Sequence, residues 1–116
     1  MLDEVKAPLY DIVQACGLIV DFTAGKELAT YRDDVYCKSA VERQFQIIGE
    51  ALNRLAKKHP DISEQIPSCR TIISFRNILV HGYDRIEDDI VWGIITAHLP
   101  DLHHVVAMML QGGDRE

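Results

Sequence analysis

The chain has 116 residues, of which 47% are hydrophobic and 26% are charged, a composition typical of one soluble globular domain covering residues 1–116. No apolar run approaches the ~20 residues that a membrane span needs, and the acidic N-terminus does not resemble a secretory signal, so we expect a cytoplasmic protein without membrane association. The net charge of −6 argues against a nucleic-acid coat protein but leaves room for a small basic site.

The first segment, up to about Gly25, predicts an amphipathic helix. Its apolar residues recur at steps of three and four, which places them on one helical face. They are Val5, Leu9, Ile12, Cys16 and Ile19, with Leu2, Val13 and Val20 alongside.

A longer helix is predicted over residues 33–59, where the same spacing recurs at Val41, Phe45, Ile48, Leu52 and Leu55. Acidic residues open this segment and basic residues close it, which suits the two ends of the helix dipole. Pro60 marks its end and begins a connector, "PDISEQIP". Pro67 is expected to be the first residue of the next helix, because a missing N–H costs nothing there.

Two further helices are expected in the C-terminal part of the chain. Asp84 is a candidate N-cap with Glu87 in capping-box spacing, and Pro100 is expected to kink or restart the helix that follows. The last apolar residues are Leu102, Val105, Val106, Met109 and Leu110. Since no strand-like alternation occurs, the predicted fold class is all-α, an antiparallel bundle of four or five helices.

Arg76 lies in the helix expected to begin at Pro67 and is the least expected residue in it. Its neighbours three and four positions away are all aliphatic, so its side chain should be covered: Ile72, Ile73, Leu79 and Val80. One interpretation is structural, with the stem packed and the guanidinium reaching water or a carboxylate such as Glu50. The other is functional, because a polar set suited to phosphate chemistry gathers at this end of the helix: Asn77, His81, Gly82 and Tyr83.

The spacing of Arg76 and His81 raises a geometric problem. Five residues along a regular helix separate two side chains by about 140° and ~7.5 Å, so the two would not meet one small group. Unwinding at Gly82 would bring them together, and so would two copies of the helix facing each other across a two-fold axis.

The stretch "RNILVHGY" resembles the Arg-(polar)-x-x-x-His-x-Tyr signature of the HEPN superfamily. The flanking "QIIGEALNRLAKKHP" and "HGYDRIEDDIVWGII" are similar to its HepT branch, the toxin half of a HEPN/nucleotidyltransferase (MNT-type) toxin–antitoxin pair of type VII character. The resemblance covers nearly the whole chain.

The resemblance implies a homodimeric endoribonuclease that needs no metal or other cofactor and cleaves an RNA, either a transfer RNA or a messenger RNA. Arg76 would hold the scissile phosphate, His81 would transfer protons, and Asn77 would orient a neighbour or contact the RNA. Tyr83 resembles the tyrosine to which the antitoxin attaches AMP. The alternative function is a catalytically inactive HEPN module that docks a nucleotidyltransferase partner.

Other polar residues suggest competing sites. His98, His103 and His104 are interpreted as surface residues, not metal ligands, because no carboxylate or cysteine completes a ligand set. Glu50 is left open between pairing with Arg76 and supporting the active site. The three cysteines, at positions 16, 37 and 69, form no CxxC pair and are expected to be buried thiols.

Overall fold

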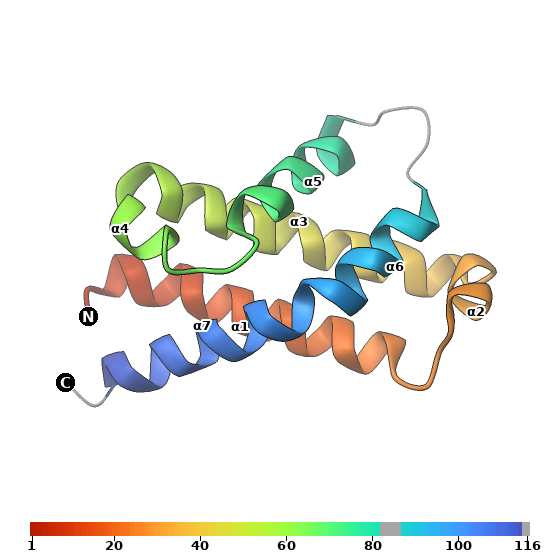
Figure 1. Ribbon diagram of the computed structural model, residues 1–116, viewed down its shortest axis with the longest axis horizontal. Coiled ribbons are helices and arrows are strands. Elements are labelled where there is room, and N and C mark those ends of the chain that lie inside the picture. Colours follow the sequence, from red (N-terminus) through yellow and green to blue (C-terminus); the bar gives the residue numbers. More distant parts are fainter. Residues whose placement is uncertain (82–86, 115–116) are drawn as a thin grey trace.

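Helices make up the secondary structure of residues 1–81 and 87–114, which are the residues that the computed structural model describes (Figure 1). Five of them are long, namely α1 (Asp3–Thr23), α3 (Val35–Lys58), α5 (Cys69–His81), α6 (Asp88–Ala97) and α7 (Leu99–Asp114). Two are short, α2 (Leu28–Arg32) and α4 (Pro60–Ser63). The all-α class is therefore confirmed, with the two short helices added to the expected long ones.

The long helices form an elongated bundle with principal extents of 45, 29 and 19 Å. α1 and α3 pack against each other in opposite directions, and α2 lies at the turn between them (Figure 1). α7 packs on α1, while α5 crosses back over α3 in the opposite direction to it. Thus α3 is the central helix, with α1 on one side and α5 on another.

The predicted apolar stripes of α1 and α3 form the core. Leu9, Ile12 and Ile19 in α1 are fully buried, as are Phe45 and Ile48 in α3. Two residues placed beside the α1 stripe are not: Leu2 precedes the helix and is 62% exposed, and Val20 is 47% exposed. Val20 follows Ile19 by 100°, which turns its side chain away from α3 and α7.

The start of α5 differs from the prediction. The helix begins at Cys69, two residues after Pro67, so Pro67 is not its first residue. Ser68, between them, has a left-handed backbone (φ 62°), and its hydroxyl lies 2.7 Å from Nδ1 of His98 at the end of α6. This hydrogen bond ties the turn before α5 to the junction of α6 and α7.

The start of α6 also differs. Glu87 is its N-cap, with an extended backbone, and cannot be the third residue of a helix capped by Asp84, so the capping-box prediction is wrong. Asp84 itself lies outside the described residues. At the other end, α6 stops at Ala97 and α7 starts at Leu99 with Pro100 in its first turn, which confirms the predicted restart.

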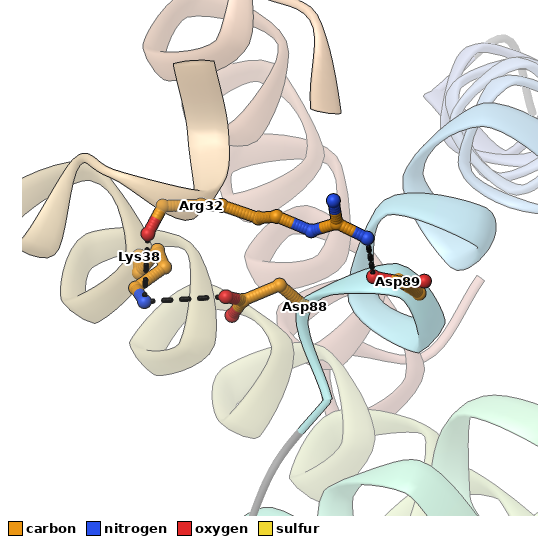
Figure 2. Close-up of polar contacts among 4 residues, drawn as sticks. All are labelled: Arg32, Lys38, Asp88 and Asp89. Carbon is orange, nitrogen blue, oxygen red and sulfur yellow. Dashed lines mark hydrogen bonds and ion pairs between the residues drawn. The ribbon is translucent and has the colours of Figure 1, made fainter. Parts of the chain in front are cut away.

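Ion pairs hold the first turn of α6 against α2 and α3 (Figure 2). Asp89 pairs with Arg32 of α2, and Asp88 accepts a 3.3 Å contact from Lys38 of α3. The Lys38 ammonium also donates to the Arg32 carbonyl at 3.1 Å, so one cation connects all three helices. These contacts fix the start of α6 against α2 and α3.

All three cysteines are free and buried, as predicted. Burial raises the pKa of the Cys16 thiol to about 12 and also raises the pKa of the Cys37 and Cys69 thiols. None of the helices in residues 1–81 and 87–114 is both long and apolar enough to cross a membrane.

Candidate functional site

Arg76 lies where α5 crosses α3, and its stem rests on Gly49. A Cβ atom at position 49 would lie 2.5 Å from Arg76 Cγ and still closer to Arg76 Cβ. Real carbon atoms do not approach so closely, so only glycine permits this crossing. Of the four aliphatic neighbours expected to cover Arg76, Ile72 and Leu79 are buried and Ile73 is half-buried, while the Val80 side chain lies outside the described part of the chain. The Arg76 side chain retains 22% of its exposure.

Two neighbours hold the guanidinium of Arg76. Its Nη1 donates to Asn77 Oδ1 at 3.0 Å, and its Nη2 lies 3.7 Å from Glu50 Oε1. Of the two roles left open for Glu50, the structure shows the pairing with Arg76. Support of an active site stays a prediction. The role of Asn77 in RNA cleavage stays a prediction, although its amide oxygen is placed to accept from Arg76.

The third nitrogen of the guanidinium, Nε, is enclosed by the protein. Nε of Arg76 is buried and has no hydrogen-bond partner within the described part of the chain. Nε is therefore closed to a phosphate, which leaves Nη1 and Nη2, each with a second N–H besides the one directed at Asn77 or Glu50, as the guanidinium donors that a phosphate could reach. These two terminal nitrogens together can still make a bidentate contact with a phosphate.

His81 is the last residue of α5, and the helix remains continuous from Arg76 to this point. The two residues therefore keep the separation of a regular helix, about 140° and ~7.5 Å. The backbone of one chain does not itself bring them together before position 82. Gly82 and Tyr83 lie outside the described residues.

The three histidines at positions 98, 103 and 104 were considered as metal ligands, and their surroundings differ. His98 bonds to the Ser68 hydroxyl, His103 is half-buried and His104 is exposed. No group of three or more His, Cys, Asp or Glu side chains in residues 1–81 and 87–114 is arranged to hold a metal ion. A hollow of about 600 Å³ opens elsewhere, between α2 and the start of α3, and Arg76 does not line it.

Glu42 lies seven residues before Gly49, on the face of α3 that α5 and α6 approach. Burial raises the pKa of its carboxyl, the nearby Asp88 raises it further, and Lys38 opposes them. Tyr31 is fully buried beside this group, and its pKa is also raised, chiefly by burial. A carboxyl group in an unfavourable environment therefore lies close to the start of α6.

Gly49 is the site residue that sequence reasoning missed. A glycine in the middle of a helix costs up to ~1 kcal/mol relative to alanine, so its presence on the inner face of a 24-residue helix is a signal of close packing. The signal does not say which residue approaches.

The fold and the site together define a small all-α protein that presents an arginine from the crossing of two helices. The chain matches the family described as "Ribonuclease HepT-like" over residues 12–109. It therefore belongs to the HepT-like ribonuclease family, within the HEPN superfamily.

Similar proteins carry ribonuclease names. "Putative RNase MJ1380" of Methanocaldococcus jannaschii is 29% identical over 91% of this chain and 96% of its own. "Putative RNase MJ0127" of the same organism is 31% identical over 84% of this chain and 80% of its own. "Probable ribonuclease HepT" of Thermococcus cleftensis is 29% identical over 81% and 84% respectively. No solved structure matches the chain significantly.

Proposed function

We propose that this chain is a metal-independent endoribonuclease and the toxin half of a toxin–antitoxin pair, built on a single domain that spans residues 1–116. The observation that carries the proposal is the Arg76 site at the α3–α5 crossing, within a chain that matches the HepT-like family over residues 12–109. The ribonuclease names of its relatives support the same activity.

The proposed reaction is an internal transfer at an RNA phosphate. The ribose 2′-oxygen attacks the adjacent phosphorus and loses its proton to a base, while the bond from phosphorus to the 5′-oxygen breaks and that oxygen gains a proton. The products are a 2′,3′-cyclic phosphate and a 5′-hydroxyl. The nucleophile belongs to the RNA, so this route requires no metal-bound water.

In this reaction His81 transfers protons and Arg76 stabilises charge. An unperturbed imidazole titrates near neutrality, which suits both the acid and the base role. The terminal nitrogens of Arg76 bind the phosphate oxygens as negative charge builds on them. Asn77 orients the guanidinium through its 3.0 Å hydrogen bond.

The active form is proposed to be a homodimer with a cleft shared by two copies of α5. The support is the regular geometry of α5, which keeps Arg76 and His81 of one chain apart up to the end of the helix. If two α5 helices face each other across a two-fold axis, Arg76 of one copy can lie closer to His81 of the other copy than to His81 of its own chain.

The test of the activity is cleavage of cellular RNA by the purified protein in EDTA. The wild type should cleave, and Arg76→Ala and His81→Ala should each lose on the order of 10² to 10⁴ in rate while keeping their helical circular dichroism. Loss of cleavage on chelation would contradict the mechanism. If His81→Ala keeps its effect in cells, the second candidate, a binding module without catalysis, is supported instead.

Regulation is proposed to occur at Tyr83 through a nucleotidyltransferase antitoxin. The phenol oxygen of Tyr83 attacks the α-phosphate of a nucleoside triphosphate such as ATP, and pyrophosphate leaves. The AMP so attached adds bulk and negative charge two residues from His81, where it competes with an RNA phosphate.

Tyr83→Phe tests this regulation because it removes only the acceptor oxygen. Intact mass after co-expression with the adjacent nucleotidyltransferase should show AMP added to the wild type and none added to Tyr83→Phe. The variant should stay toxic in the presence of the partner. Added mass on Tyr83→Phe, or its full neutralisation, would place the control elsewhere, as occlusion of the cleft by the bound antitoxin.

A further inference from the structure

Positive charge is concentrated on α3 and α5. These two helices carry seven of the twelve Lys and Arg residues of the chain and only two of its eighteen Asp and Glu residues. The rest of the chain carries five basic and sixteen acidic residues. A protein with a net charge of −6 therefore contains one pair of helices with the opposite sign, and this pair includes Arg76.

Three of these cations form a row on the outside of α3, which we call the basic stripe: Arg43, Arg54 and Lys57. At 100° per residue their side chains and that of Glu50 fall within about 60° of one another around the helix axis. The stripe is about 21 Å long from Arg43 to Lys57. Because Glu50 pairs with Arg76, the stripe passes directly beside the candidate site.

The cations of the stripe are exposed and largely unpaired. Among residues 1–81 and 87–114, no carboxylate pairs with Arg43 or Lys57. Arg54 makes only a long 3.5 Å contact with Asp11, and both side chains are about half exposed or more. The helix dipole favours Lys57 near the end of α3 but does not account for Arg43, which is in the first half of the helix.

We propose that the basic stripe binds the phosphate backbone of single-stranded RNA and leads it past Arg76. The proposal rests on the proposed ribonuclease function and adds the path of the substrate to it. The stripe extends on both sides of the Gly49–Arg76 contact, with Arg43 about 9 Å to one side along α3 and Lys57 about 12 Å to the other. RNA bound there has phosphates on both sides of the one that is cleaved.

The arrangement fits one strand better than a duplex or an acidic protein. A single row of cations follows one backbone, whereas duplex RNA is contacted across a groove with phosphates on two strands. An acidic protein would meet the sixteen acidic residues elsewhere on the chain as well as the stripe.

The test is RNA binding by the full chain carrying His81→Ala, so that cleavage does not interfere. The probe is a fluorescein-labelled single-stranded RNA, and anisotropy is measured over a range of salt concentrations. Arg43→Gln with Lys57→Gln removes two charges from the stripe. The matched control, Lys6→Gln with Lys26→Gln, removes two charges in and just after α1.

The stripe variant should bind more weakly by on the order of tenfold at low salt, whereas the control should change less than about twofold. The slope of log affinity against log salt should fall by about 0.7 for each RNA phosphate that the variant no longer neutralises. Equal affinities and slopes in the two variants would overturn the proposal. A parent chain that binds no RNA would do the same.

The outcome is separable from that of the proposed function. If the wild type cleaves no RNA but the stripe variant selectively loses binding, the path stands and the catalytic proposal fails. If the wild type cleaves RNA and the stripe variant binds like the control, the catalytic proposal stands and the path fails. If the stripe variant instead loses its affinity for an acidic protein and keeps its RNA affinity, the occupant is that protein and the RNA path is wrong.

Discussion

At the scale of single residues, Gly49 determines how closely Arg76 can approach α3. A Cβ at position 49 would collide with Cβ and Cγ of Arg76, and the Arg76 Cβ is fixed by its backbone, so no change of rotamer removes the collision. The short distance between α3 and α5 therefore depends on the absence of a side chain at Gly49. The same absence determines where along α3 the Arg76 guanidinium meets Glu50.

Gly49→Ala should lower the free energy of unfolding by about 1–3 kcal/mol, because the added methyl group forces α5 away from α3. Gly93→Ala is the matched control, since Gly93 is also helical and a Cβ there would meet nothing within 4 Å. That control should be neutral or more stable by up to ~1 kcal/mol. Urea unfolding measures both, and equal effects of the two substitutions would contradict the close approach.

Sequence reasoning reached part of this site. The aliphatic neighbours of Arg76 predicted a covered stem, and Glu50 was named as a carboxylate that its guanidinium could meet. Gly49 was not assigned a role, since its importance depends on which residue of α5 crosses above it. That register is a tertiary property and has no local signature.

At the scale of elements, the junction of α2, α3 and α6 combines favourable and unfavourable charges. Lys38 pairs with Asp88 and Arg32 pairs with Asp89 (Figure 2). Glu42, in contrast, has an acid beside it and a pKa raised chiefly by burial. From the sequence, no partner was assigned to Asp88 or Asp89. Their partners come from residues some 50 positions earlier, and helical periodicity does not identify such pairs.

Glu42→Gln should stabilise the protein at neutral pH. A carboxyl with a raised pKa in the folded state favours folding while it is protonated and loses that contribution as pH rises through its folded pKa. The variant and the wild type should therefore melt alike below the ordinary Glu pKa of about 4.3 and diverge as pH rises to 7. Thermal unfolding followed across this pH range measures the divergence.

Glu64→Gln is the control for this effect, since Glu64 is exposed at the end of α4. The same divergence in Glu64→Gln would show that lower net charge, and not the environment of Glu42, is responsible. A Glu42→Gln melting temperature below that of the wild type at pH 7 would contradict the burial argument.

At the scale of the whole molecule, apolar periodicity was sufficient for the fold class and for the order of the long helices. Stripes at steps of three and four predicted the buried faces of α1 and α3, because burial of such a face is what stabilises a helix in a bundle. The predicted helix starts at Pro67 and after Asp84 were wrong, since each start depends on contacts with a distant element. At Ser68 the contact is with His98, and at α6 it is with Lys38 and Arg32.

The protein should be a homodimer that buries the exposed side of α5. Light scattering at micromolar concentration should give twice the 13.1 kDa mass of the chain. Ile78→Lys, at a residue 39% exposed on α5, should shift the mass to that of a monomer by placing a charge in an apolar interface. Met108→Lys, on α7 and 55% exposed, should leave the dimer intact. A monomeric wild type would contradict the shared cleft.

The three native cysteines should react poorly with thiol reagents, which allows site-directed labelling of the protein. Thiol reagents react with the nucleophilic thiolate, and Cys16, Cys37 and Cys69 are all buried with a raised pKa. Arg70→Cys, at an exposed position in the first turn of α5 and two turns from Ile78, should therefore take up a nitroxide spin label alone, with no need to remove the native thiols. Pulsed electron resonance between two such labels would then measure how far apart the α5 helices of two copies lie in solution.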